Sequence, residues 1–355
     1  MPINKYNELV CTPSSSIKEL DITGAYLRKI ILDPFSSLMT KANKLILIPS
    51  MHTWVLPFDA LPINDTIGEI GEGRLIERYV FQKEFSLTSW QKDDNESEVP
   101  DVRILAVAPR FNAPLKKQLS RLTSRDTSLI DLPGSRKECL KISEFFPTKL
   151  IIGYDATEQM FDSLAPHFSV IHLSTHGVPS KENDKLQMLA FNANPSDTLQ
   201  DCFLTLYEIL NMKLSNNLVV LSACRSAIGI SNKSEGSINL AWAFRQAGVK
   251  SILVSQWDVN DYASSEIMPA FYKSLSDGFG KAEALRQAKL DFIAGNDPLF
   301  HHPYYWAAFD YIGDNSQLCS GTSLFGNFRG VYFYAAMSII LLITFLIWRY
   351  RIKNL

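Results

Sequence analysis

The sequence has 355 residues, and 46% of them are hydrophobic, which is enough apolar material to bury the core of one large domain or two small ones. The formal net charge of -2 argues against a nucleic-acid-binding protein, because that class usually carries a strong basic excess. The five cysteines are irregularly spaced and include no C-x-x-C pair, so they support neither a zinc ribbon nor a disulfide framework. A reducing compartment is the simpler interpretation.

The first 41 residues are expected to form a helical lead-in to one large domain over residues 42–313. Residues 1–20 are polar and lack the apolar core of a signal peptide, so no export signal is expected at this end. Together with the small number of cysteines, this favours a cytoplasmic location for the large domain.

Short apolar runs alternate with amphipathic stretches along the large domain. The predicted strands are Leu45–Ile48, Arg103–Ala108, Lys149–Ile152, Ser169–Ser174, Leu218–Ser222, Ser251–Ser255 and Phe309–Ile312. Four predicted helices are Gly134–Phe146, Ser237–Ala247, Ser264–Leu275 and Lys281–Ile293. A fifth is capped by Thr157 and contains Leu164. Several strands lack polar alternation, which is typical of strands buried on both faces. The sequence therefore predicts an α/β fold with a mostly parallel sheet flanked by helices on both faces.

The C-terminal part of the sequence is expected to anchor the domain in a membrane. Residues 314–330 form a polar linker, and Val331–Trp348 are 18 residues without a charge, just long enough for a transmembrane helix. Aromatic side chains lie near both ends of this segment, and residues 349–355 form a basic tail. A buried C-terminal helix is the alternative, but no segment follows that could cover it. The basic tail by itself would place the domain outside the cell, whereas the absence of an export signal favours the cytoplasm.

Two of the predicted strands end in side chains that could act together in acyl transfer. His176 and Gly177 follow the strand Ser169–Ser174, and Cys224 follows the strand Leu218–Ser222. Ligands of a parallel α/β sheet bind beyond the carboxyl ends of its strands. If these two strands are neighbours, an imidazole base and a thiol nucleophile lie at one edge of the sheet. The backbone N–H groups of Gly177 and Cys224 could then donate to an oxyanion.

Each of these residues alone also has a structural interpretation. A cysteine after an apolar strand is more often a buried structural thiol than a nucleophile. A histidine near a sheet edge often serves only as a hydrogen-bonding residue, and His172, inside the predicted strand, is the better candidate for that role. The pair is more informative, because the 48 residues from His176 to Cys224 are close to the spacing of about 50 residues in caspases. Cys224 also lies in an Ala-Cys-Arg run like the centre of the caspase Gln-Ala-Cys-Arg-Gly motif, although the flanking positions are Ser222 and Ser226.

A series of short motifs then follows in order along nearly the whole large domain. They are Ile48–Pro49, Leu56–Leu61, Leu132–Ser135 with Glu138, Asp155–Thr157, His172–Gly177, Leu221–Cys224, Glu235–Gly236, Ala243–Phe244, Ala247–Gly248, Trp257–Asp261, Phe271–Tyr272, Asp297–Pro298 and His302–Phe309. In this order the motifs resemble those of the CHAT domain, a branch of the caspase-like peptidases related to separase. The resemblance implies a caspase-like fold and endopeptidase activity that needs neither a metal nor an organic cofactor.

The resemblance also implies roles for individual residues. It makes His176 the general base, Cys224 the nucleophile and Gly177 a backbone donor to the oxyanion. In separase-like members an acidic residue of a Trp-Asp-Val segment helps to hold a basic residue of the substrate.

That acidic residue corresponds to Asp258, which becomes a candidate for the floor of a specificity pocket. Gln256 and Trp257 lie beside it in the sequence, and Ser222 replaces the caspase glutamine near the nucleophile, so these three residues are also expected at the substrate-binding site. The alternative role of Asp258 is to cap or position the following helix, because Asp is a preferred capping residue.

The leading hypothesis is therefore a membrane-anchored cysteine endopeptidase that acts on protein substrates, with cleavage after a basic residue as the expected preference. An activating protein partner is expected as well, because the polar segment Ala227–Gly236 after the nucleophile could be ordered by binding. Members of the family often carry helical repeats before the peptidase domain, and no such repeats occur in this sequence.

The alternative hypothesis is a non-catalytic, membrane-bound scaffold or sensor with the same fold. Other enzyme classes have weaker support. Gly278–Lys281 lacks the spacing and the Ser or Thr of a phosphate-binding loop, no G-x-S-x-G run is present, and the adjacent His301 and His302 alone do not make a metal site.

Overall fold

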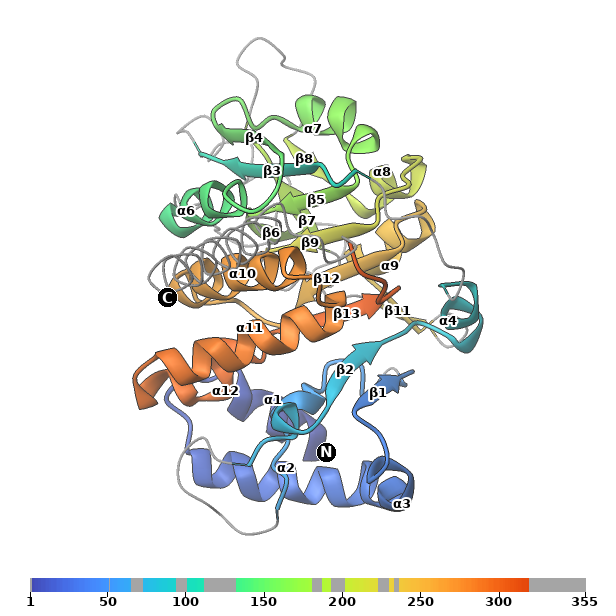
Figure 1. Ribbon diagram of the computed structural model, residues 1–355, viewed down its shortest axis with the longest axis vertical. Coiled ribbons are helices and arrows are strands. Elements are labelled where there is room, and N and C mark those ends of the chain that lie inside the picture. The colour runs from blue at the N-terminus through green and yellow to red at the C-terminus, as the bar shows by residue number, and fades with distance from the viewer. Residues whose placement is uncertain are drawn as a thin grey trace, which may run out of the picture.

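The core of the protein is an eight-stranded mixed sheet with the order β1-β2-β13-β12-β9-β5-β3-β4 (Figure 1). In that order the strands are Lys44–Leu47, Val80–Lys83, Phe309–Gly313, Ser251–Ser255, Leu218–Leu221, Val170–Leu173, Ile104–Pro109 and Thr148–Gly153. The computed structural model describes residues 2–50, 52–64, 73–93, 101–111, 132–180, 187–192, 202–222, 230–232 and 236–318.

The sheet consists of two parallel blocks that run in opposite directions. β12, β9, β5, β3 and β4 are parallel to one another, and β13, β2 and β1 form the second block. The blocks meet at β12 and β13, which pair antiparallel. The carboxyl ends of the first block therefore lie along one edge of the sheet, called here the carboxyl edge, whereas β13 ends at the opposite edge.

Helices and smaller sheets surround this core. The α-helices are α1 (Pro2–Val10), α2 (Ile17–Ile31), α3 (Ser36–Met39), α4 (Leu87–Asp93), α6 (Pro133–Ile142), α7 (Glu158–Leu164), α8 (Leu206–Asn211), α9 (Leu240–Gln246), α10 (Asp261–Ser276), α11 (Lys281–Gly295) and α12 (Pro303–Trp306). Short 3-10 helices span Asp33–Phe35, Phe58–Ala60, Leu75–Glu77, Ala165–His167 and Pro298–His301. β6 (Gly177–Pro179), β7 (Gln187–Ala190) and β8 (Phe203–Leu204) form one small sheet, and β10 (Ile230–Asn232) and β11 (Gly236–Ile238) form another.

Successive side chains of the central strands face opposite sides of the sheet, as the pleat requires. In β9, Val220 packs into the cluster that contains α6, α10 and α11, and Val219 packs into the cluster that contains α7, α8 and α9. Both faces are therefore covered, which explains why the strand sequences are continuously apolar. The predicted α/β architecture, with a mostly parallel sheet and helices on both faces, is confirmed.

β2 was not predicted, because its last two residues are polar and still buried. Gln82 Nε2 donates to the carbonyl oxygen of Gly313 at 2.8 Å, and Lys83 Nζ lies 2.6 Å from Asp310 Oδ2. Both partners belong to β13, more than 200 residues away in sequence. A pattern of apolar residues does not reveal such a strand, since burial depends on partners supplied by the fold.

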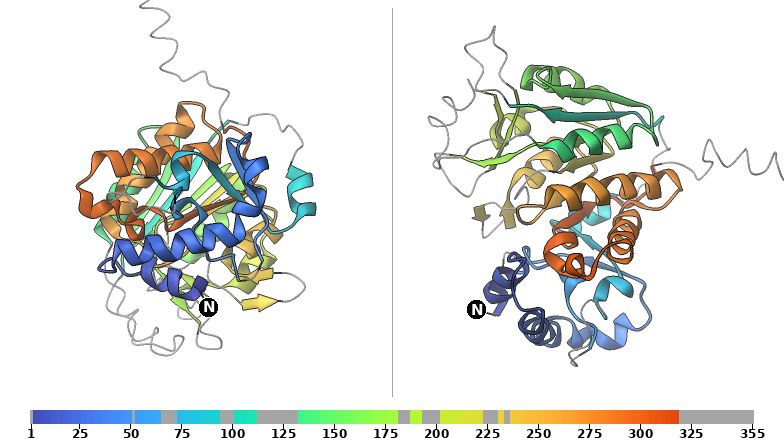
Figure 2. Two further views of the ribbon diagram at one scale, coloured as in Figure 1. Left: turned by 90° about the horizontal axis from the view of Figure 1, so that it is seen from below. Right: turned by 90° about the vertical axis from the view of Figure 1, so that its left-hand side faces the viewer.

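The N-terminal helices α1, α2 and α3 gather at one end of the molecule, beyond β1 and β2 (Figure 2). Tyr6 and Leu20 are fully buried in the same apolar cluster as α10 and α11. The hydroxyl of Tyr6 also donates to the carbonyl oxygen of Ala60 at 3.1 Å. The predicted lead-in is thus packed into the core of the large domain.

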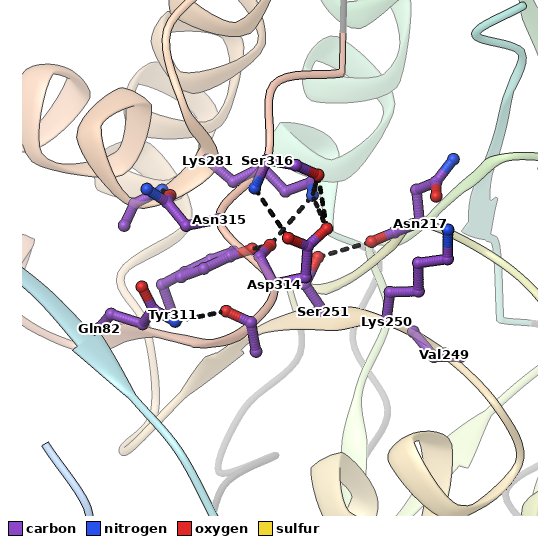
Figure 3. A network of polar contacts seen from close by, with 12 residues as sticks. Gln82, Asn217, Val249, Lys250, Ser251, Lys281, Tyr311, Asp314, Asn315 and Ser316 are labelled. Atoms are coloured by element: carbon purple, nitrogen blue, oxygen red, sulfur yellow. Dashed lines mark hydrogen bonds and ion pairs between the residues drawn. The ribbon is translucent and has the colours of Figure 1, made fainter. Parts of the chain in front are cut away.

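A polar network holds the chain where it leaves β13 (Figure 3). Lys281 Nζ, at the start of α11, lies 3.0 Å from Asp314 Oδ2, and the backbone N–H of Ser316 donates to Asp314 Oδ1 at 2.9 Å. Burial alone would raise the pKa of Asp314, but Lys281 and the hydrogen bonds from Ser316 outweigh it and hold this pKa below its usual value. The segment after β13 is thereby fixed against the first turn of α11.

No helix in the described part of the chain is both long and apolar enough to cross a membrane. The predicted span Val331–Trp348 and the basic tail lie outside the described residues, as does the linker from residue 319 onward.

Candidate active site

The strands that precede the two predicted catalytic residues are neighbours in the sheet. β5 and β9 pair in parallel, with Leu173 opposite Leu221. In the sequence, His176 and Cys224 each lie three residues after this pair, so the segments that carry them leave the sheet at its carboxyl edge. Cys224 itself lies outside the described residues. The condition on which the dyad prediction depended, adjacency of the two strands, is met.

His176 is positioned by the small sheet that follows it. Its carbonyl oxygen accepts a hydrogen bond from the N–H of Ala190 at 3.0 Å. The ring is half-buried, and its centroid lies 5.2 Å from that of Phe111, which follows β3. Backbone pairing and ring packing therefore both restrict where the imidazole can lie.

Gly177 is the first residue of β6 and lies opposite Leu189 of β7. Because His176 and Ala190 occupy a hydrogen-bonded position of this antiparallel ladder, the next pair is a non-hydrogen-bonded one. The N–H of Gly177 therefore points out of the ladder, which is the orientation that a donor to an oxyanion needs.

Gln256, Trp257 and Asp258, all expected at the substrate-binding site, follow β12, the strand next to β9, but their environments differ. Gln256 is buried, and its amide donates to Asp310 Oδ2 and to the carbonyl oxygen of Trp54. Trp257 is also buried, and its indole N–H donates to the carbonyl oxygen of Tyr304 at 3.0 Å. The polar groups of both side chains are thus used inside the protein.

Asp258, in contrast, is exposed at the carboxyl edge. The helix that follows it, α10, is capped by Asn260, whose side chain accepts a hydrogen bond from the N–H of Ala263 at 3.1 Å. The capping role considered for Asp258 therefore belongs to Asn260.

A buried polar network, called here the Glu138 network, lies between the carboxyl edge and the helices α6 and α10. Its members are Glu138, His172, Ser174, Ser222, Ser264 and Tyr272. His172 is fully buried, with Nδ1 3.2 Å from the hydroxyl of Tyr272 and Nε2 2.8 Å from Glu138 Oε1. This matches the structural role predicted for His172.

Ser222, expected near the substrate, is half-buried, and its hydroxyl lies 2.7 Å from that of Ser264. Sequence reasoning did not assign a role to Glu138 or Ser264. The burial of Glu138 could have been predicted, because it shares three- and four-residue spacing with Ser135, Cys139 and Ile142 on one face of α6. A buried carboxylate without a partner would be costly, so a polar partner for Glu138 was to be expected.

An open cavity of about 700 Å³ lies further along the same edge, beyond β3 and β4. Its lining includes Arg110, Arg136 and Tyr154, and the guanidinium of Arg110 lies 5.7 Å from the ring centroid of Tyr154. Within the described ranges, no three His, Cys, Asp or Glu side chains cluster in a way that could hold a metal ion.

Comparison with known proteins places the chain in a family. The family model for the CHAT domain matches residues 21–314, beginning in α2 rather than at residue 42. Tetratricopeptide repeat protein 28 from mouse and from human is 28% identical over 225 residues, which cover 55% of this chain. The chain spans only 9% of the length of these relatives.

Two of the solved structures that are similar to this chain illustrate the low sequence identity of these matches. The Saccharomyces cerevisiae separase–securin complex matches with a TM-score of 0.47 and 12% identity, covering 76% of this chain and 15% of that one. The complex of the Porphyromonas gingivalis RgpB pro- and mature domains matches with a TM-score of 0.47 and 11% identity, covering 90% of this chain and 77% of that one. Because the family model covers residues 21–314, most of the sequence, the chain belongs to the CHAT domain family.

Proposed function

We propose that the protein is a cysteine endopeptidase in which His176 and Cys224 form the catalytic dyad. The observation that carries the proposal is the pairing of β5 with β9, with Leu173 opposite Leu221, which brings the two segments out at one edge. Membership of the CHAT domain family, related to separase and caspases, supports the same reaction class.

In the proposed reaction, Cys224 Sγ attacks the scissile carbonyl carbon while His176 accepts the thiol proton. The N–H of Gly177 donates to the oxyanion of the tetrahedral intermediate. When the C–N bond breaks, His176 transfers the proton to the leaving amine and a thioester remains. Water then hydrolyses the thioester, and the thiol is regenerated.

The proposed substrate class rests on Asp258, which follows β12, the strand next to β9. Asp258 presents a carboxylate at the carboxyl edge, so we propose a protein substrate with a basic side chain at the cleavage position. We further propose that Val331–Trp348 anchor the protein in a membrane and that a protein partner activates it. Deletion of residues 331–355 should move the protein from the membrane fraction to the soluble fraction; an unchanged distribution would contradict the anchor.

Covalent capture tests the dyad directly. The full-length chain is treated with peptidyl electrophiles that carry Arg, Asp or Leu at the cleavage position, and labelled thiols are mapped by mass spectrometry. We expect Cys224 to react much faster than the exposed thiol of Cys11. His176→Ala should slow labelling of Cys224 by about 100-fold or more, because a positioned general base contributes that much.

The control is the rate at Cys11, which should be equal in both proteins. Labelling of Cys224 at the rate of Cys11, with and without added cell lysate as a source of activators, would contradict the peptidase proposal.

A scaffold function is the second candidate. The outer face of α2 exposes Ile22, Tyr26 and Ile30, which are spaced four residues apart and are each more than half exposed. The curated relatives are named as tetratricopeptide repeat proteins, and an exposed apolar stripe of this kind is suited to protein docking. Loss of binding partners after substitution of this stripe, in a protein without Cys224 reactivity, would favour the scaffold.

A further inference from the structure

One buried carboxylate is linked to both segments of the proposed dyad. We infer that Glu138 is a positioning residue that fixes the segment carrying His176 relative to the segment carrying Cys224. The inference rests on the proposed function for its catalytic meaning, but the linkage itself is a property of the described residues.

On the β5 side, the link runs through Ser174, two residues before His176. The hydroxyl of Ser174 donates to Glu138 Oε2 at 3.3 Å, and Ser174 is 2% exposed. Its backbone N–H donates to the carbonyl oxygen of Val107 in β3 at 2.9 Å. The side chain of Ser174 therefore connects the end of β5 to α6, while its backbone stays in the sheet.

On the β9 side, the link runs through two serines. Ser222, two residues before Cys224, has its hydroxyl 2.7 Å from that of Ser264 on α10. The hydroxyl of Ser264 donates to Glu138 Oε2 at 3.2 Å. The same carboxylate oxygen thus accepts hydrogen bonds from both branches, and α6 and α10 join the ends of β5 and β9.

The other carboxylate oxygen faces His172. Burial and the charge of Glu138 raise the pKa of the Tyr272 phenol, so its hydroxyl keeps its proton and can donate to His172 Nδ1. The Nε2 atom of His172 lies 2.8 Å from Glu138 Oε1. These two atoms face each other without the alignment of a hydrogen bond, so the hydrogen bonds to Glu138 come from the two serine hydroxyls at Oε2.

The energetic argument follows from burial. Glu138 is 1% exposed, and a carboxylate removed from water is destabilised further by each hydrogen-bond donor that it loses. Displacing either the Ser174 branch or the Ser264 branch removes a charge-assisted hydrogen bond in a low-dielectric environment. The conformation of lowest free energy is therefore the one in which Glu138 is bonded to both Ser174 and Ser264, so that the ends of β5 and β9 are fixed together.

The test uses the full-length chain with Glu138→Gln, Ser174→Ala and Ser264→Ala. Ser265→Ala is the matched control, because Ser265 is the next residue on α10, is also buried, and donates to the carbonyl oxygen of Tyr262 within its own helix at 2.9 Å. Two quantities are measured: hydrogen exchange at the carboxyl ends of β5 and β9, and the kinetics of Cys224 labelling by the best peptidyl electrophile.

We expect Ser264→Ala to raise exchange at the end of β9 only, Ser174→Ala at the end of β5 only, and Glu138→Gln at both. Each variant should lower the maximal labelling rate constant by between about 10-fold and 100-fold, because a misplacement near 1 Å has effects of this size. The electrophile concentration at half-maximal rate should stay within twofold of wild type, since binding is not altered. Ser265→Ala should change none of these quantities by more than twofold.

Equal effects of Ser264→Ala and Ser265→Ala, or raised exchange at both strand ends in every variant, would overturn the inference, because they indicate general loosening. If the exchange pattern is as expected but wild-type Cys224 reacts no faster than Cys11, the linkage stands and the proposed peptidase function fails. If Cys224 is reactive and the exchange pattern is absent, the function stands and the positioning role fails.

Discussion

The side chain of Asp258 differs from its two neighbours in being exposed where β12 reaches the carboxyl edge. Gln256 and Trp257 are buried and bonded to other parts of the chain, so a change at either would disturb packing as well as any substrate contact. Because the side chain of Asp258 is exposed, a substitution there changes the packing of the core least among the three.

Asp258→Asn is expected to slow Cys224 labelling by an electrophile with Arg at the cleavage position by about tenfold or more, because a charge-assisted pair loses its charge. Labelling by the corresponding Leu electrophile should stay within twofold of wild type. The comparison of the two rate constants in the same preparation provides the internal control. An equal decrease for both electrophiles would indicate that Asp258 shapes the site rather than selecting a basic side chain.

The polar residues inside the fold mark the limit of what single residues in the sequence could show. His172 was predicted as a structural residue because it lies within an apolar strand, and the strand positions ahead of His176 and Cys224 were correct. Glu138 could not be connected to Ser264, because the two residues are 126 positions apart and meet only when α6 packs beside α10. Its apolar neighbours on α6 indicated burial, but not the identity of its partners.

At the level of elements, the connection between α9 and β12 depends on one glycine. Gly248 has a φ of +112°, and a Cβ at this position would lie 2.1 Å from the carbonyl oxygen of Leu214. The N–H of Leu214 in turn donates to the carbonyl oxygen of Ala247 at 2.8 Å. The chain before β9 is therefore packed directly against the end of α9, in contact that leaves no room for a side chain.

Gly248→Ala is expected to lower the free energy of unfolding by at least about 2 kcal/mol, because it combines an unfavourable φ with a backbone clash. Gly295→Ala is the matched control, since nothing lies within 4 Å of a Cβ at that position near the end of α11. This second change should be neutral or stabilise the protein by up to about 1 kcal/mol. Urea unfolding of both variants measures the difference, and similar losses in the two would show that the close approach to Leu214 relaxes.

The predicted strands share a continuous apolar pattern, which β2 lacks at its end. All seven predicted strands occur within one or two residues of their expected ends, from β1 to β13. α9 begins at Leu240 rather than Ser237, because the preceding residues pair as β11 and Asn239 caps the helix. β2 escaped prediction because the burial of Lys83 depends on distant partners, namely Asp310 and the carbonyl oxygens of Trp54 and Leu56.

At the scale of the whole molecule, polar contacts join the N-terminal helices to the C-terminal half. His302, which caps α12 by accepting from the N–H of Tyr304, has Nε2 3.1 Å from the hydroxyl of Ser15. Arg74, in the segment before β2, lies 2.6 Å from Asp21 of α2, and its charge also acts on His302. Burial, with a smaller contribution from the charge of Arg74, lowers the pKa of His302 to about 4.

This pKa predicts a loss of stability in mild acid. The folded protein keeps His302 neutral, whereas the unfolded chain protonates it near pH 6.5, so the unfolded state binds more protons between pH 6.5 and about 4. The stability that depends on a neutral His302 is complete above pH 6.5 and is lost as the pH falls through this window. Between pH 7.5 and 5 we expect His302 to lower the free energy of unfolding by about 1 to 2 kcal/mol, allowing for solvent screening.

His302→Asn separates this effect from other titrations, because Asn can still cap α12 but does not titrate. The urea midpoint of the variant should fall less than that of wild type between pH 7.5 and 5. Parallel curves for the two proteins would show that His302 is protonated without cost in the folded state.

Because β13 runs antiparallel to β12, the chain leaves the sheet at the edge opposite the carboxyl edge, and a C-terminal membrane anchor would pull on the domain from there. β13 ends at the edge opposite His176, where Lys281 and Asp314 fix the departing segment. If Val331–Trp348 enter a bilayer, as proposed, residues 319–330 allow a separation of at most about 40 Å between lipid and domain. Tension on such a tether acts on β13 and α11 rather than on β5 and β9. The carboxyl edge would then lie on the side of the domain away from the tether, where soluble substrates could reach it from the aqueous phase.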